Sequence, residues 1–196
     1  MSKLLYSLVV IMLALQLGAC AQAPQQEIDG AKAAIEAARS LEKYAPEAFK
    51  QASDALNTAV AEVEAQNGKF ALTRSYSQAK QLLAHATEAA SKAKAAGEAK
   101  REEVKKTAEV VWQEAQTALD AAKAAVETAP RGKGTDADIA AMKADLDAQA
   151  TALNEAQSAF RSGDYLTAQS KAESVKTMAT QISNDIAQAR AKKGRR

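Results

Sequence analysis

The chain contains few residues whose chemistry could support catalysis. It has one cysteine, Cys20, and one histidine, His85. A lone thiol can form neither an internal disulfide nor a cysteine-based zinc site, so Cys20 is reactive, modified or incidental. A histidine that acts as a base or a metal ligand needs a nucleophile or a second ligand beside it, and the sequence supplies neither. We therefore interpret His85 as a residue on a helix surface.

Neighbouring carboxylates are the other candidates for acid–base chemistry. Two such pairs are Glu102 with Glu103, and Asp136 with Asp138. Acidic residues at a helix start interact favourably with the helix dipole, so we interpret both pairs as solvated surface charges. The sequence has no Gly-x-x-x-x-Gly-Lys phosphate loop and no zincin motif. We expect no enzymatic activity, no cofactor and no metal site.

The residues before Cys20 have the order of a secretory signal. Lys3 precedes an apolar run, Leu4 to Leu17, and the small residues Gly18 and Ala19 follow. This run of about 14 residues is shorter than the roughly 20 that a transmembrane helix needs. We expect residues 1–19 to be a signal peptide that is removed. An ordinary signal peptide with a chance cysteine near its cleavage site is the alternative.

The segment Leu17-Gly18-Ala19-Cys20 resembles the lipobox of bacterial lipoproteins. The resemblance implies that the Cys20 thiol takes a diacylglyceryl group, that cleavage occurs before Cys20, and that the new amino group is acylated. Two or three acyl chains anchor a protein durably, since each buried methylene contributes about 0.8 kcal/mol. Related inner-membrane lipoproteins often have aspartate where this chain has Ala21. The resemblance therefore implies an outer-membrane location, with the lipidated chain facing the periplasm.

The composition after Cys20 predicts an all-α protein. The chain is 47% hydrophobic but only 4% aromatic, because alanine makes up roughly a quarter of it, and 26% of residues are charged. Alanine is the best helix former, and it allows helix backbones to approach closely. We predict an elongated antiparallel helical bundle of about five helices with alanine-rich seams and one long central helix. A deep enzyme pocket is disfavoured.

The apolar periodicity divides the mature chain into segments. They are a tether over residues 20–27, an N-terminal alanine-rich helical domain over 28–128, a loop over 129–135, a C-terminal helical hairpin over 136–191, and a basic tail over 192–196.

Within the N-terminal domain, the pattern predicts three helices. The first ends near Pro46, and the second ends at a left-handed Gly68. The third, long helix begins near Phe70 with Leu72 on its apolar face. Gly97 costs this helix about 1 kcal/mol relative to alanine without obliging a break.

The stretch Ala34–Ala59, followed by Gly68-Lys69-Phe70, resembles a helical domain of unknown function from proteobacterial envelope lipoproteins. The shared features are an alanine- and arginine-bearing first helix, a Tyr-Ala-Pro corner and a Gly-x-aromatic turn. The likeness covers about residues 28–95 and departs from the family pattern at Thr73. It implies a place in the cell envelope and no activity.

Two further features suggest partners. Trp112, the only tryptophan, is a candidate anchor for a protein partner, and packing within the bundle is the alternative. The C-terminal end is a candidate contact for peptidoglycan, lipopolysaccharide or another anionic surface, or it merely complements a helix C-terminus. Its basic residues are Arg190, Lys192, Lys193, Arg195 and Arg196.

The charge distribution argues against nucleic acid as a partner. The net charge is +2, and the rest of the mature chain is mildly acidic once the basic end is set aside. We therefore expect a non-catalytic, lipid-anchored envelope lipoprotein with a structural or protein-binding role and possible self-association. Peptidoglycan or lipopolysaccharide binding through the basic tail is the alternative function.

Overall fold

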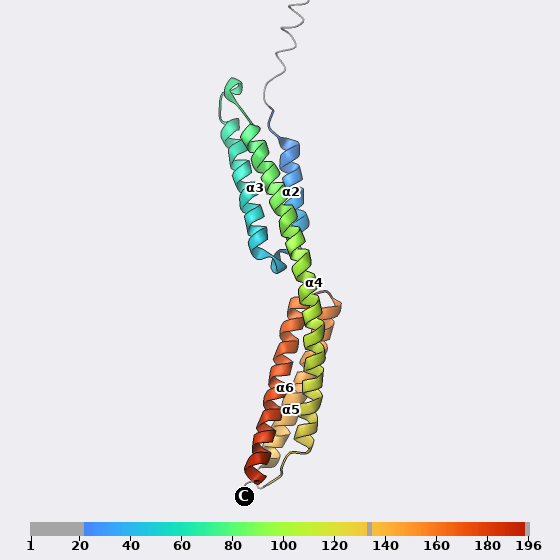
Figure 1. Cartoon of the computed structure of the whole chain (residues 1–196). Helices are drawn as coiled ribbons and strands as arrows, with labels where there is room; N and C mark the ends of the chain where they lie inside the picture. The colour runs from blue at the N-terminus through green and yellow to red at the C-terminus, as the bar shows by residue number, and fades with distance from the viewer. Residues whose placement is uncertain (1–21, 133–134, 195–196) are drawn as a thin grey trace, which may run out of the picture. The chain divides into compact units, whose positions relative to one another are not determined.

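The structure, a computed structural model, describes residues 22–132 and 135–194. Over these ranges the chain is all-α, as predicted, and one of its five α-helices is 51 residues long (Figure 1). The α-helices are α2 (Gln25–Arg39), α3 (Pro46–Asn67), α4 (Ser77–Glu127), α5 (Thr135–Arg161) and α6 (Tyr165–Gly194), and the short 3-10 helices are η2 (Glu42–Tyr44) and η3 (Ala71–Thr73).

The chain divides into two compact units between Ala99 and Lys100. Helix α4 contributes its first part to unit 1 and its remainder to unit 2. This boundary differs from the expected N-terminal domain over residues 28–128. The difference arises because the apolar residues of α4 from Val111 to Val126 pack in the same cluster as those of α5 and α6.

Unit 1 consists of α2, α3 and the first part of α4 side by side (Figure 1). Alanines with almost no exposed surface occupy the helix seams, so little space is left between the backbones. Larger residues fill the remaining positions. One buried cluster comprises Ile28, Ala31, Ala59, Val63, Tyr76, Ala79, Leu83 and Ala86. A second comprises Ile35, Ala38, Phe49, Ala52, Ala90 and Ala93.

Unit 2 joins the remainder of α4 to the antiparallel pair α5 and α6. Leu119, Leu146 and Val175 are among its most deeply buried side chains. Residues Ile139, Leu146 and Leu153, spaced at sevens, face this core, and Phe160 is half-buried at the end of the series. The apolar stripe of α4 is therefore closed within the chain.

The turn between α5 and α6 is a helix C-cap built around Gly163. The backbone N–H of Asp164 donates to Ala159 O at 2.9 Å, and that of Gly163 donates to Phe160 O at 3.0 Å. These are the two hydrogen bonds of a Schellman motif. Gly163 has φ +82°, the left-handed conformation that glycine adopts without steric cost.

Helix α4 continues through Gly97 without a break, and a close neighbour of this position explains why glycine occupies it. A Cβ atom at position 97 would lie 2.6 Å from Leu41 Cβ and 3.2 Å from Leu41 O. Leu41 is buried just before η2, where the chain turns from α2 into α3. Glycine therefore lets α4 pass directly against this corner.

Three sequence predictions in unit 1 are corrected. The tether ends earlier than residue 27, because α2 begins at Gln25 and Pro24 is already buried. Helix α3 ends at Asn67 as expected, but Gly68 is right-handed with φ −70°. Helix α4 begins at Ser77 rather than near Phe70, so Leu72 lies in η3 and not on a helix face.

Candidate functional site

Cys20, the predicted acylation site, lies outside the described residues. The folded part of the chain begins close behind it in sequence, because α2 starts at Gln25. Glu27, in the first turn of α2, forms an ion pair with Lys80 of α4 at 3.0 Å. A hydrogen bond to its own backbone, and then the bond from Lys80, hold the pKa of Glu27 below its ordinary value. The start of α2 is thus tied to the start of α4.

None of the helices in the described ranges is long and apolar enough to cross a membrane.

The basic C-terminal end is partly committed to contacts within unit 2. Arg190 Nη2 donates to the carbonyl oxygens of Ala125 and Thr128, both at 3.2 Å, and also to the Thr128 hydroxyl. Lys193 Nζ donates to Arg131 O at 3.2 Å. Unpaired carbonyls at a helix C-terminus carry partial negative charge, so Arg190 partly neutralises the end of α4, while Lys193 contacts the loop that follows.

The other members of the basic group are not held in this way by the contacts described. Lys192 is exposed on α6. Arg195 and Arg196 lie outside the described residues. Among the described members of the basic group, Arg190 and Lys193 are therefore engaged within unit 2, whereas Lys192 is exposed.

Trp112 is half-buried and packs against the core of unit 2. Its indole Nε1 is buried and has no hydrogen-bond partner among the described residues. The ring also lines a surface depression of about 280 Å³, together with Glu109, Gln113, Gln157, Phe160 and Arg161. An unpaired buried donor costs on the order of 1–3 kcal/mol. This depression combines an aromatic wall with amide and charged groups.

His85 is exposed on α4, as expected. It lines a depression of about 180 Å³ between α3 and α4 with Ala48, Gln51, Glu88, Ala89 and Lys92. Glu88 forms an ion pair with Lys92 at 2.7 Å, and the hydrogen bond from Lys92 is the main cause that lowers the pKa of Glu88. His85 contributes only a small part of that effect. The carboxylate therefore serves a local ion pair.

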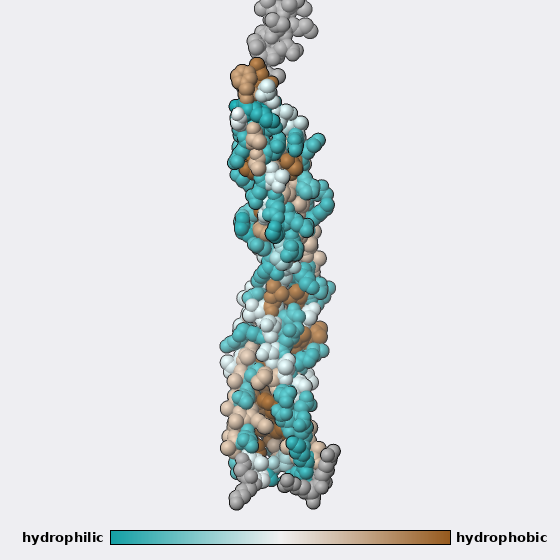
Figure 2. All heavy atoms as spheres, turned by 90° about the vertical axis from the view of Figure 1, so that its left-hand side faces the viewer, coloured by the Kyte–Doolittle hydropathy of each residue, from teal (hydrophilic) through white to brown (hydrophobic). Residues whose placement is uncertain are grey.

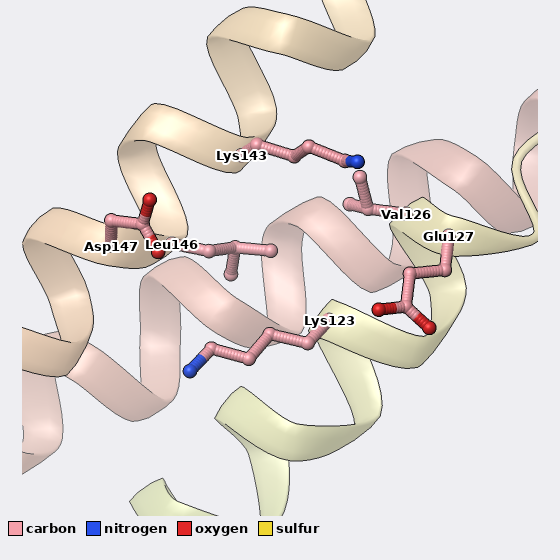
Figure 3. Close-up of a pocket in the computed structure, with 6 residues that line it drawn as sticks. All are labelled: Lys123, Val126, Glu127, Lys143, Leu146 and Asp147. Carbon is pink, nitrogen blue, oxygen red and sulfur yellow. The ribbon is translucent and has the colours of Figure 1, made fainter.

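A third depression lies between α4 and α5 and measures about 270 Å³ (Figure 3). Val126 and Leu146 supply apolar side chains, and four charged side chains of both signs surround them: Lys123, Glu127, Lys143 and Asp147. The six residues include no serine, threonine, cysteine or histidine. This arrangement is ordinary for a solvated groove between two helices.

The carboxylate pairs singled out from the sequence lie on helix surfaces. Glu103 pairs with Lys100 at 2.8 Å, and Glu102 lies 4.0 Å from Lys105. Asp136 and Asp138 lie in the first turn of α5. Within the residues that the structure describes, no group of three or more His, Cys, Asp or Glu side chains is placed to hold a metal ion.

Sequence reasoning missed one exposed apolar feature. Phe70 is 72% exposed and Leu72 is 82% exposed, both in the loop between α3 and α4. The helical spacing of Leu72 relative to Tyr76 and Ala79 placed it on a buried stripe. The signal that could have found the loop was the cluster of turn-favouring residues from Thr73 to Ser77.

No family model, curated protein or solved structure matches this chain.

Proposed function

We propose that this protein is a non-catalytic, lipid-anchored lipoprotein of the bacterial outer membrane that faces the periplasm and has a structural or protein-binding role. The observation that carries the proposal is the lipobox-like segment Leu17–Cys20 placed directly before a folded helical unit. Only Ala21 to Pro24 separate Cys20 from the first residue of α2. An acylated Cys20 would hold unit 1 beside the bilayer.

The use of the chain's apolar and charged residues supports a non-catalytic role. Its buried apolar residues pack in alanine-rich seams inside each unit. Many of its charges form ion pairs along or between helices, such as Lys50 with Asp54 and Lys176 with Glu114. These patterns are typical of helical bundles whose surfaces, rather than an enclosed pocket, contact other molecules.

The depression beside Trp112 is the part of the chain that best supports a protein partner. Tryptophan and arginine are enriched where binding energy concentrates in protein interfaces. Trp112, Phe160 and Arg161 lie around one depression, so two aromatic side chains and one guanidinium line the same surface hollow. Gln113, at the edge of the depression, is exposed. A photoreactive amino acid for crosslinking to a partner is therefore better placed at Gln113 than at Trp112, which packs against the core.

The alternative role, binding of peptidoglycan or lipopolysaccharide through the basic end, has less support. Arg190 and Lys193 are engaged with carbonyl groups at the end of α4 and in the following loop. Their charge is therefore partly used within the protein.

The test of the main proposal is metabolic labelling with palmitate in a bacterial host. The native chain incorporates the label and sediments with the outer membrane, whereas the Cys20→Ala variant does neither. A Ser40→Ala variant, changed at an exposed position of unit 1, serves as the matched control and behaves as the native chain does. A native chain without label, or a Cys20→Ala variant that remains in the outer membrane, overturns the proposal.

A further inference from the structure

The loop between α3 and α4 exposes two large apolar side chains in a chain that has few of them. Phe70 and Leu72 leave 72% and 82% of their surface in water, more than any other large hydrophobic residue in the described ranges. Their neighbours Ala71 and Thr73 are small, so the two side chains project from a loop that has little bulk around them. Apolar colour gathers at this end of unit 1, while much of the face below it is hydrophilic (Figure 2).

Hydrogen bonds fix the backbone that carries these side chains. Arg74 Nε donates to Lys69 O at 2.9 Å, and Arg74 Nη2 donates to Asn67 O at 3.0 Å. The Thr73 hydroxyl donates to Phe70 O at 2.9 Å. The loop is closed on itself, so Phe70 and Leu72 are held outward by a defined structure.

The base of the loop is also anchored to the unit. The backbone N–H of Ser75 donates to Gln66 Oε1 at 3.1 Å, and Gln66 is a buried polar residue of unit 1. Tyr76 is buried in the same cluster as Ile28 and Val63, and its hydroxyl donates to Asn67 Oδ1. The exposed pair therefore projects from a rigid platform.

This loop lies at the end of unit 1 where α2 begins (Figure 1). The ion pair between Glu27 and Lys80 and the contact cluster of Ile28 with Tyr76 join the two regions. Cys20 precedes Gln25 by five residues, and a chain of that length spans at most about 18 Å when fully extended. An acyl anchor at Cys20 would therefore keep the loop close to the membrane surface.

The charge of the segment suits an anionic surface. Residues 66–78 contain two cations, Lys69 and Arg74, and no acidic residue. Lys69 is exposed next to Phe70. Basic residues flanking exposed aromatic and aliphatic side chains are typical of segments that rest in the headgroup region of a bilayer.

We propose that residues 69–74 form a membrane-contact loop, in which Phe70 and Leu72 enter the interfacial region of an anionic phospholipid bilayer and Lys69 faces its phosphates. The proposal rests on the proposed function, because the acylated Cys20 delivers the loop to the bilayer. A protein partner fits less well, since stable protein interfaces bury about 800 Å² per side and two side chains on a narrow loop supply a small part of that.

The test measures contact between the loop and lipid acyl chains by tryptophan fluorescence. The full chain carries Phe70→Trp in a Trp112→Phe background, so that the probe is the only tryptophan. The matched control carries Ser40→Trp in the same background, because Ser40 is exposed in unit 1 next to η2. Each protein is purified from membranes and reconstituted into vesicles of phosphatidylethanolamine and phosphatidylglycerol with brominated acyl chains. Palmitate incorporation is measured on the same samples.

The proposal predicts strong quenching at position 70 and little at position 40. Replacing Leu72 with serine in the same background lowers the equilibrium constant for loop insertion by at least about tenfold, the effect of removing one large buried apolar side chain. Circular dichroism confirms that each variant is folded.

The outcomes separate the loop from the anchor. Palmitate incorporation with equal, weak quenching at both positions overturns the membrane-contact loop and leaves the anchor in place. Quenching at position 70 without palmitate supports the loop and overturns the anchor. Weak quenching at both positions without palmitate overturns both.

Discussion

The replacement of Gly97 by alanine tests how α4 passes the corner between α2 and α3. Helix propensity alone predicts that alanine stabilises α4 by about 1 kcal/mol, because glycine is a poor helix former. The structure predicts the opposite sign. A Cβ atom at position 97 would meet Leu41 Cβ at 2.6 Å, well inside van der Waals contact.

The size of the effect follows from what has to move. Leu41 Cβ is bonded directly to the backbone, so no side-chain rotation relieves the contact, and Leu41 O at 3.2 Å adds to it. The corner or α4 has to shift, and inserting a methyl group into a packed site typically costs about 1–3 kcal/mol. After the gain in propensity is subtracted, we expect Gly97→Ala to lower the free energy of unfolding by up to about 2 kcal/mol.

Gly30 provides a matched control inside α2. It is exposed, and nothing lies within 4 Å of a Cβ atom built at this position. Gly30→Ala therefore gains propensity without a clash and should stabilise the protein by about 0.5–1 kcal/mol. The assay is urea unfolding followed by far-ultraviolet circular dichroism. If Gly97→Ala stabilises the protein as much as Gly30→Ala does, the packing of α4 against Leu41 is wrong.

Three further predictions concern unit 2, the basic end and the surface ion pairs. Gly163→Ala should destabilise the protein by about 1 kcal/mol in urea unfolding, because a left-handed conformation is unfavourable for alanine, and an unchanged midpoint would contradict the turn geometry. Arg190→Gln should lower the thermal unfolding midpoint by an amount that corresponds to about 0.5–1 kcal/mol, because it removes the contacts with the end of α4. Deleting residues 192–196 should leave the recovery of the protein in a sacculus pull-down unchanged. Loss of recovery would favour the peptidoglycan-binding alternative. The pKa values of Glu27 and Glu88 are lowered, so their ionised carboxylates favour the folded state. This contribution to stability is present above pH 4.5 and is lost as the pH falls below that value. The thermal unfolding midpoint should therefore fall slightly as the pH is lowered through this range, and a rise would contradict the pairing with Lys80 and Lys92.

Helical periodicity predicted the seams of the protein because each seam residue recurs every three or four positions. The buried stripe of α4, from Leu83 through Leu119 to Val126, follows a helical spacing in the sequence, as do Ile139, Leu146 and Leu153 in α5. The turn at Gly163 was also predictable, since Ser-Gly-Asp interrupts the pattern between two apolar stripes. These features depend on local sequence alone.

Other features depend on contacts between distant residues and could not be read from the sequence. The turn-favouring residues from Thr73 to Ser77 signal a loop near Leu72, but the path of that loop depends on the hydrogen bonds from Arg74 to Lys69 O and Asn67 O. The close packing at Gly97 depends on Leu41, which lies in the connection between α2 and α3. The boundary at Ala99 arises because one continuous helix supplies seams to two different sets of partners.

Each candidate site also combines a feature that is visible in the sequence with one that depends on folding. The basic residues at the C-terminal end formed a simple cluster in the sequence, but the contacts of Arg190 with Ala125 and Thr128 come from chain folding. Trp112 was marked by its rarity alone. Its unpaired indole nitrogen and the depression beside it depend on the packing of α4 against α5.

The proposed function depends on a mature chain that begins at an acylated Cys20. The decisive measurement is mass spectrometry of the N-terminal peptide, taken from protein extracted out of the bacterial outer membrane. We expect a peptide that starts at Cys20 and carries a diacylglyceryl group on the thiol. A peptide with a free Cys20 thiol, or one that begins upstream of Cys20 or downstream of it, would refute the proposed anchor.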